Sequence, residues 1–262
     1  MVQRIALVLE FQGSHYHGWQ RQENAASIQG VVEQALMEME QVLRPIVAAG
    51  RTDAGVHGQA MVAHADVDFQ RWQRSPRAYL HGLNAHLPDD VKVVGVKAVD
   101  ADFHARFQCV ERSYRYQIWN RSTASALHRW QHWWMPRPLN VEAMQQAAQL
   151  LLGEHDFSSF RAAHCQAASP IKILKQLDVR IGDDWQIMLD VRANAFLYHM
   201  VRNLVGALVQ VGLARWSVEE IAQVLAAKSR NHTAPTAPAH GLYFTNARYS
   251  DWCARDVVGV AV

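Results

Sequence analysis

The residues best suited to chemistry lie in the eight-residue loop 50–57, whose sequence is GRTDAGVH. Asp53 is the only acidic residue between Glu40 and Asp66, and Arg51 stands two residues before it. A carboxylate that a positive neighbour keeps ionised can act as a nucleophile or as a base. Glycine and aspartate are also ordinary turn residues, so a simple hairpin turn is the other interpretation of this loop.

A second candidate segment, residues 106–121, is basic and aromatic. Guanidinium groups bind phosphate and aromatic rings stack on bases, so this pattern is typical of an RNA-binding strand. An amphipathic strand with a solvated charged face would show the same pattern. The segment contains Arg106, Arg112, Arg115 and Arg121, interleaved with Phe107, Tyr114, Tyr116 and Trp119.

Composition sets the limits for these candidates. The chain has 262 residues, of which 50% are hydrophobic, and a net charge of +2, so it is globular and its overall charge does not indicate a nucleic-acid partner. No apolar run approaches a membrane span. Three widely separated cysteines indicate a reducing cytoplasm rather than a disulfide framework. The nearest histidine pair, His15 and His17, lacks further ligands at suitable spacing, so we expect no metal.

The first half of the chain must position the loop. Apolar residues alternate in the segments before and after it, which indicates strands, and Ser27 precedes an apolar stripe at helical spacing. The resulting order is β-α-β-β-α-β, the split βαβ or ferredoxin-like pattern. The predicted strands are 5–11, 46–49, 61–69 and 91–99, and the predicted helices follow Ser27 and Ser75.

The second half repeats this order with an extra strand and an extra helix. We therefore predict an α+β fold with two tandem ferredoxin-like (split βαβ, RRM-like) units packed around a central cleft. The predicted domains are 1–104, which carries the aspartate loop, and 105–262. The predicted strands here are 111–119, 131–135, 171–181, 185–193 and 242–249, and the predicted helices are 141–152, 196–214 and 217–227.

Eight short motifs, in the right order along nearly the whole chain, resemble the signatures of the TruA family of tRNA pseudouridine synthases. Besides the loop 50–57 they are FQGSHYHGWQRQ (11–22), LNAHLP (83–88), DFHARF (102–107), RSYRYQIWN (112–120), LLGEHDFSSFR (151–161), ANAFLYHMVRNLVG (193–206) and GLYF (241–244).

This resemblance implies the pseudouridine synthase fold and an isomerase that acts on uridines 38, 39 and 40 of the tRNA anticodon stem-loop. The enzyme breaks the N-glycosidic bond, turns the uracil and rejoins it through carbon. It needs no cofactor, which agrees with the lack of nucleotide-binding motifs in the sequence. The resemblance also implies a cytoplasmic homodimer that binds tRNA and no membrane.

The resemblance makes Asp53 the catalytic residue, as a nucleophile or as a base. We expect Arg202 to be the cation that orients this carboxylate and keeps it ionised. An arginine in so apolar a helix is usually paired, although a solvated arginine on a polar face is the alternative. Gly206, one turn later, would let another backbone come close.

The remaining site residues have supporting roles. The family pattern selects Tyr114 to stack on the target base, whereas Tyr116 is expected in the core. Arg51 would help to extrude a base from the stem. Leu242 would close the pocket, and His57 would only support the loop.

Two other function classes remain open at this point. Ferredoxin-like units often bind RNA, so a noncatalytic RNA-binding module or RNA chaperone is one alternative. A nucleoside hydrolase or glycosidase is the other, but Asp53 has no obvious acidic mate. The cluster Trp130, Trp133 and Trp134 could belong to the core or to a dimer interface, and we expect the core.

Overall fold

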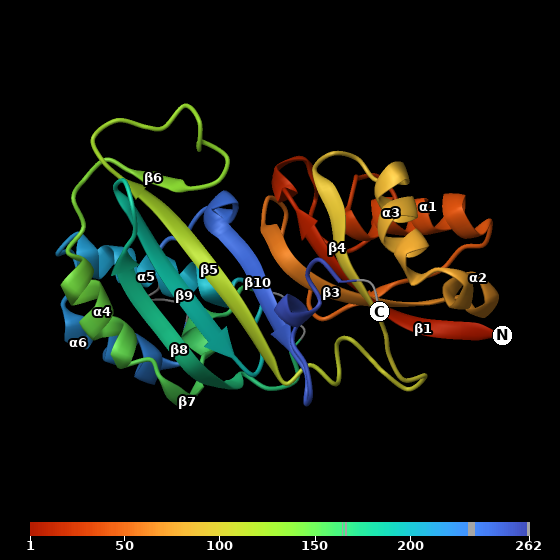
Figure 1. The fold of residues 1–262 in the computed structure, drawn as a ribbon. Helices are drawn as coiled ribbons and strands as arrows, with labels where there is room; N and C mark the ends of the chain where they lie inside the picture. The colour runs from red at the N-terminus through yellow and green to blue at the C-terminus, as the bar shows by residue number, and fades with distance from the viewer. Residues whose placement is uncertain (164, 166, 230–233, 261–262) are drawn as a thin grey trace. The chain divides into compact units, whose positions relative to one another are not determined.

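The computed structural model describes residues 1–163, 165, 167–229 and 234–260. The chain forms two compact units (Figure 1). The first unit contains residues 1–110 and the chain from Phe244 onward, and the second contains residues 111–243. These units do not coincide with the predicted domains, because the last strand returns the end of the chain to the first unit.

The first unit is built on a sheet in the order β4-β1-β3-β10, with β2 paired to β3. The pairs β1–β3, β1–β4 and β2–β3 are antiparallel. Helices α1 and α3 pack on each other, and α3 packs on β4 (Figure 1). The elements are β1 (Val2–Phe11), α1 (Ile28–Glu40), β2 (Val47–Ala48), β3 (His57–Asp68), α2 (Phe69–Arg74), α3 (Pro76–His86), β4 (Val91–Ala98) and β10 (Leu242–Arg248), with 3-10 turns η1 (Gly13–His15) and η5 (Ala254–Asp256).

Local chemistry explains these elements. Ser27 caps α1 by accepting a hydrogen bond from the Gly30 backbone N–H, as the sequence predicts. Strand β1 pairs with β3 along one edge and with β4 along the other. Its residues from Ile5 to Leu9 are fully buried, so side chains pack against both of its faces. The short helix α2 was not predicted. Asp68 caps it directly after β3 by accepting from the Arg71 backbone N–H.

The second unit contains a sheet in the order β5-β9-β8-β7, which is antiparallel throughout, and β6 pairs with β5 in parallel. Helix α4 packs on β8, α5 and α6. The elements are β5 (Glu111–Asn120), β6 (Trp133–Met135), α4 (Val141–Gln149), β7 (Gly153–Asp156), η2 (Ser158–Phe160), β8 (Ile171–Ile181), β9 (Gln186–Ala193), α5 (Met200–Gly212), α6 (Val218–Ala227) and η4 (Ala239–Gly241).

Helix α5 is the core helix of this unit, and most of its residues are buried. It begins at Met200, so the predicted start at Phe196 is wrong. The physical reason is His199, whose φ of 61° and ψ of 3° lie in the left-handed region and interrupt a right-handed helix. The α+β class predicted from the element order is confirmed. Within the described ranges, no helix combines the length and the apolar character that a membrane crossing requires.

The expectation that the three neighbouring tryptophans lie in the core is wrong for two of them. Trp130 is 53% exposed and Trp134 is 43% exposed, whereas Trp133 is half-buried and packs edge-on against Tyr116. Trp133 and Trp134 are successive residues of β6, so their side chains point to opposite faces of the strand and only Trp133 turns toward the interior. Trp130 precedes the strand.

Candidate active site

Asp53 lies in the loop that connects β2 to β3. The two strands pair at Val47–His64 and Ala48–Ala63, so both ends of the loop are held by the sheet. The Val56 backbone N–H donates to the Asp53 carbonyl oxygen at 3.1 Å, which closes a turn around the aspartate. The Asp53 side chain is half-buried and that of Arg51 is exposed.

The segment 11–22 supports this loop through backbone hydrogen bonds. The Trp19 N–H donates to the Thr52 carbonyl oxygen at 3.0 Å, and the Gly55 N–H donates to the Tyr16 carbonyl oxygen at 3.3 Å. The Tyr16 hydroxyl donates to Asp90 at 2.6 Å, and burial together with this bond raises the pKa of Tyr16. The motif FQGSHYHGWQRQ therefore holds the residues that flank Asp53.

His57 and Gly18 fix the loop from two further sides. The Gly13 N–H donates to Nδ1 of the buried His57 at 3.0 Å, so the supporting role expected for His57 agrees with this contact. Gly18 has a φ of +92°, and a Cβ atom at this position would lie 2.5 Å from the Thr52 carbonyl oxygen. Only glycine satisfies both the conformation and the close approach.

Strand β5 positions Tyr114 and Tyr116 on its buried face. Tyr114 is 8% exposed, and its ring meets Phe196 edge to face at 5.0 Å between centroids. Tyr116 is fully buried and donates from its hydroxyl to the Pro238 carbonyl oxygen at 2.7 Å, which confirms its place in the core. Burial raises the pKa of Tyr116, and the charge of Arg202 opposes this shift.

Arg202 is fixed in the second unit by contacts with one backbone segment. Its Nε donates to the Ala237 carbonyl oxygen at 2.8 Å, and its own carbonyl oxygen accepts from the Ala237 N–H at 3.1 Å. A Cβ atom on Gly206 would lie 2.1 Å from the Pro235 carbonyl oxygen, so the expected close backbone approach at this glycine is confirmed. Nothing in the sequence indicated that Arg202 would donate to the backbone of Ala237.

The same segment continues to Leu242, the buried first residue of β10. Gly241 lies directly on the Tyr116 ring, because an added Cβ would be 2.7 Å from the ring carbon Cζ. His240 is half-buried nearby, and burial lowers its pKa, aided by the charge of Arg202 and opposed by a bond to the His132 backbone. In the second unit, Arg202 and Tyr116 therefore both contact the segment that leads to Leu242.

The predicted site residues fall into two groups. Arg51 and Asp53 belong to the first unit, and Tyr114, Arg202 and Leu242 belong to the second. Among the residues that the structure describes, no group of three or more histidine, cysteine, aspartate or glutamate side chains could hold a metal ion.

Comparisons with known proteins identify the family. A family model described as tRNA pseudouridine synthase matches residues 7–108 and 147–250. The tRNA pseudouridine synthase A of Rhodospirillum centenum is 47% identical over 95% of this chain and 100% of that protein. Its counterpart in Paramagnetospirillum magneticum is 46% identical over 94% of this chain and 95% of that protein. The counterpart in Bartonella henselae is 44% identical over 94% and 99%. These matches confirm the resemblance, and the chain belongs to the tRNA pseudouridine synthase A family.

Proposed function

We propose that this chain converts uridine to pseudouridine at positions 38, 39 and 40 of the tRNA anticodon stem-loop. The bond from uracil N1 to the ribose C1′ breaks, and a bond from uracil C5 to C1′ forms. The proton on C5 leaves and N1 gains one, so atoms and electrons balance without an oxidant or reductant. The observation that carries this proposal is the position of Asp53, half-buried in a loop held by several backbone contacts.

Asp53 starts the reaction as the nucleophile or as the base. A carboxylate in either role must be ionised. We assign Arg202 as the cation that keeps it ionised, because its guanidinium is half-buried in an apolar helix and is oriented by the Ala237 carbonyl. An arginine held in this way loses little side-chain entropy when it binds a carboxylate.

The other residues prepare the substrate. Tyr114 stacks on the target base, with its ring orientation set by Phe196. Leu242 closes the apolar side of the pocket. Arg51 is exposed beside Asp53, so it can hold a phosphate or fill the space that an extruded base leaves.

The assembly that we propose is a cytoplasmic homodimer with one tRNA contacting both subunits. Family membership supports this assignment, and sedimentation velocity with and without tRNA tests it. A protein that sediments as a monomer at every concentration tested, both alone and with tRNA, would contradict the dimer.

Pseudouridine mapping tests the activity and its key residue together. Wild type and Asp53→Asn act on an unmodified tRNA with uridines at 38, 39 and 40, without added metal or nucleotide, and carbodiimide adducts locate the product. Asp89→Asn is the matched control, because it makes the same change at a fully exposed carboxylate of the first unit. We expect product from wild type and from the control and none from Asp53→Asn.

Two other results would contradict this proposal. Tight tRNA binding by wild type without any product would favour the noncatalytic RNA-binding module. Turnover by Asp53→Asn at the wild-type rate would exclude Asp53 as the catalytic group. For Arg202, a methionine variant with an unchanged rate and an unchanged pH profile would exclude the assigned pairing.

A further inference from the structure

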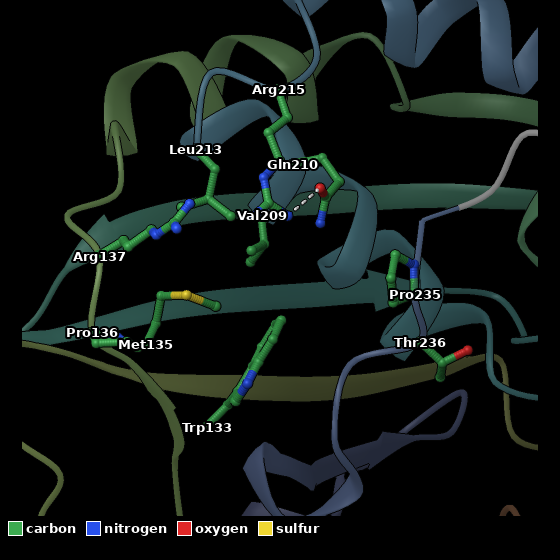
Figure 2. A pocket seen from close by; sticks show the side chains of 10 residues that line it. All are labelled: Trp133, Met135, Pro136, Arg137, Val209, Gln210, Leu213, Arg215, Pro235 and Thr236. Atoms are coloured by element: carbon green, nitrogen blue, oxygen red, sulfur yellow. Dashed lines mark hydrogen bonds between the residues drawn. The ribbon is translucent and has the colours of Figure 1, made fainter.

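The second unit contains a cavity of about 290 Å³ between β6 and the C-terminal part of α5 (Figure 2). This volume lies just below the usual range for ligand pockets, roughly 300 to 1,000 Å³, so it suits a ligand no larger than one base or nucleoside. The cavity is lined by Trp133, Met135, Pro136, Arg137, Val209, Gln210, Leu213, Arg215, Pro235 and Thr236.

The cavity adjoins the site assigned to the target uridine, because its lining residue Thr236 directly precedes Ala237, which accepts a hydrogen bond from Arg202. The rest of the lining lies farther from that site. Strand β6 pairs with Ile118 to Asn120 of β5, which begin four residues beyond Tyr114, or about 13 Å along a strand. On α5 the lining starts at Val209, seven residues beyond Arg202, or about 10 Å along a helix. A ligand in this cavity therefore occupies a different place in the same unit.

The lining combines an aromatic ring with two guanidinium groups. Figure 2 shows the Trp133 ring standing between Met135 and Pro235, which gives a planar apolar wall. Arg137 and Arg215 are exposed at the rim, and Arg215 donates to the Gln210 side-chain oxygen at 3.2 Å. None of the lining residues is acidic. A flat aromatic wall with guanidinium groups at its edge binds a base and its phosphate.

The chain segment that contributes Trp133 to Arg137 to the lining has the same character. Residues 121–137 contain three arginines and no aspartate or glutamate. The Arg121 guanidinium lies 5.0 Å from the Trp119 ring and 5.3 Å from the Trp185 ring. Arg129 lies 5.0 Å from the ring of Trp130. We call residues 121–137 the basic aromatic segment.

The lining itself carries two arginines and no carboxylate. Carboxylates of the same unit stand outside it: Asp183 and Asp184 precede Trp185, and Glu219 and Glu220 follow Arg215 by four and five residues. The positive charge that attracts a polyanion to the cavity is therefore that of Arg137 and Arg215.

We propose that this cavity binds an unstacked nucleotide of the tRNA other than the target uridine. The base lies against Trp133, and its flanking phosphates meet Arg137 and Arg215. The inference rests on the proposed function, because it takes tRNA as the substrate. A second copy of the chain fits this surface less well, since a two-fold contact here would bring its arginines against their own counterparts.

Equilibrium binding of unmodified tRNA to the full-length protein tests the inference. The double variant Arg137→Ala/Arg215→Ala should raise the Kd about tenfold and reduce the slope of log Kd against log salt by about two. The double variant Arg74→Ala/Arg77→Ala removes the same charge from exposed positions of the first unit and is the matched control. It should leave both quantities within twofold of wild type.

A second pair of variants changes the volume of the cavity without changing the charge around it. Leu213→Phe should fill the cavity and raise the Kd several-fold without changing the salt slope, whereas Leu213→Met keeps the volume and should bind like wild type. Circular dichroism and the melting temperature verify that each variant is folded. Binding of all cavity variants at the wild-type Kd and salt slope would overturn the inference.

Three further outcomes separate the alternatives. Weakened tRNA binding that accompanies dissociation into monomers in sedimentation velocity would overturn the inference in favour of a contact between copies. Micromolar binding of free uridine monophosphate, abolished by Leu213→Phe, would replace tRNA by a free nucleotide. If wild type forms no pseudouridine but the cavity variants still weaken tRNA binding as stated, the proposed function fails and this inference stands.

Discussion

Protonation of His64 should destabilise the first unit as the pH falls below 6.5. His64 lies on β3, is 7% exposed, and accepts a hydrogen bond at Nδ1 from the Ala105 backbone N–H at 3.1 Å. Burial lowers its pKa to about 4, aided by the charges of Arg4 and His104 and opposed by Asp66. Adding a proton at Nδ1 would break this bond and place a charge in the core.

The magnitude follows from linkage. The ordinary histidine pKa of about 6.5 applies to the unfolded chain, so the difference of about 2.5 units corresponds to roughly 3 kcal/mol in total. Between pH 4 and 6.5 the unfolded chain binds more protons than the folded one, so stability rises with pH. The contribution of neutral His64 to the free energy of unfolding is fully present above pH 6.5 and is lost as the pH falls to 4. Between pH 7 and pH 5 the loss is about 2 kcal/mol.

Urea unfolding at pH 7 and pH 5 measures this contribution. The difference between the two unfolding free energies should be about 2 kcal/mol smaller in His64→Gln than in wild type. The exposed residue His15 supplies the control, since His15→Gln also removes one imidazole. An NMR titration of the His64 ring gives the folded pKa directly. A midpoint near 6.5, or the same pH dependence in His64→Gln and wild type, would refute the reasoning.

Three further perturbations test the site residues. Gly206→Ala should push Pro235 and its neighbours off α5. In single-turnover kinetics the rate of pseudouridine formation should fall at least tenfold with little change in tRNA affinity. An unchanged rate would show that the contact between Gly206 and Pro235 does not position Arg202. Tyr114→Phe should retain tRNA binding, whereas Tyr114→Ala should lose turnover, and an active alanine variant would remove Tyr114 from the site. Arg51→Ala should slow modification of a paired stem uridine more than that of a loop uridine, so an equal loss at both would count against base extrusion.

Periodicity and local chemistry predicted the elements that carry their own signal. The helix after Ser27 has a cap and an apolar stripe, and both occur in α1. The strand after the aspartate loop alternates, and it occurs as β3. By contrast, β7 has the sequence GEHD, which contains no apolar residue, so only its pairing with β8 makes it a strand.

The sequence yields candidate side chains for the site, which remain predictions, but it does not reveal the backbone groups that contact them. The motif resemblance selected Asp53 and the family, and the comparisons confirm the family. The neighbour of Arg202 is a backbone carbonyl of Ala237, and a carbonyl has no signature in a sequence. The left-handed backbone at His199 was equally invisible, because glycine and asparagine are the residue types that signal this conformation in a sequence and neither stands at position 199.

The division of β10 at Phe244 has a consequence for the order in which the molecule is made. The first unit starts at the N-terminus, but its sheet needs residues that follow the whole second unit in the chain. A ribosome must therefore synthesise residues 111–243 before β3 can receive its last neighbour. Domains usually form in the order of synthesis, at about 5 to 20 residues per second. Here the unit that begins first is completed last, and until then the β3 edge on that side is open to chaperones or to pairing with another nascent chain.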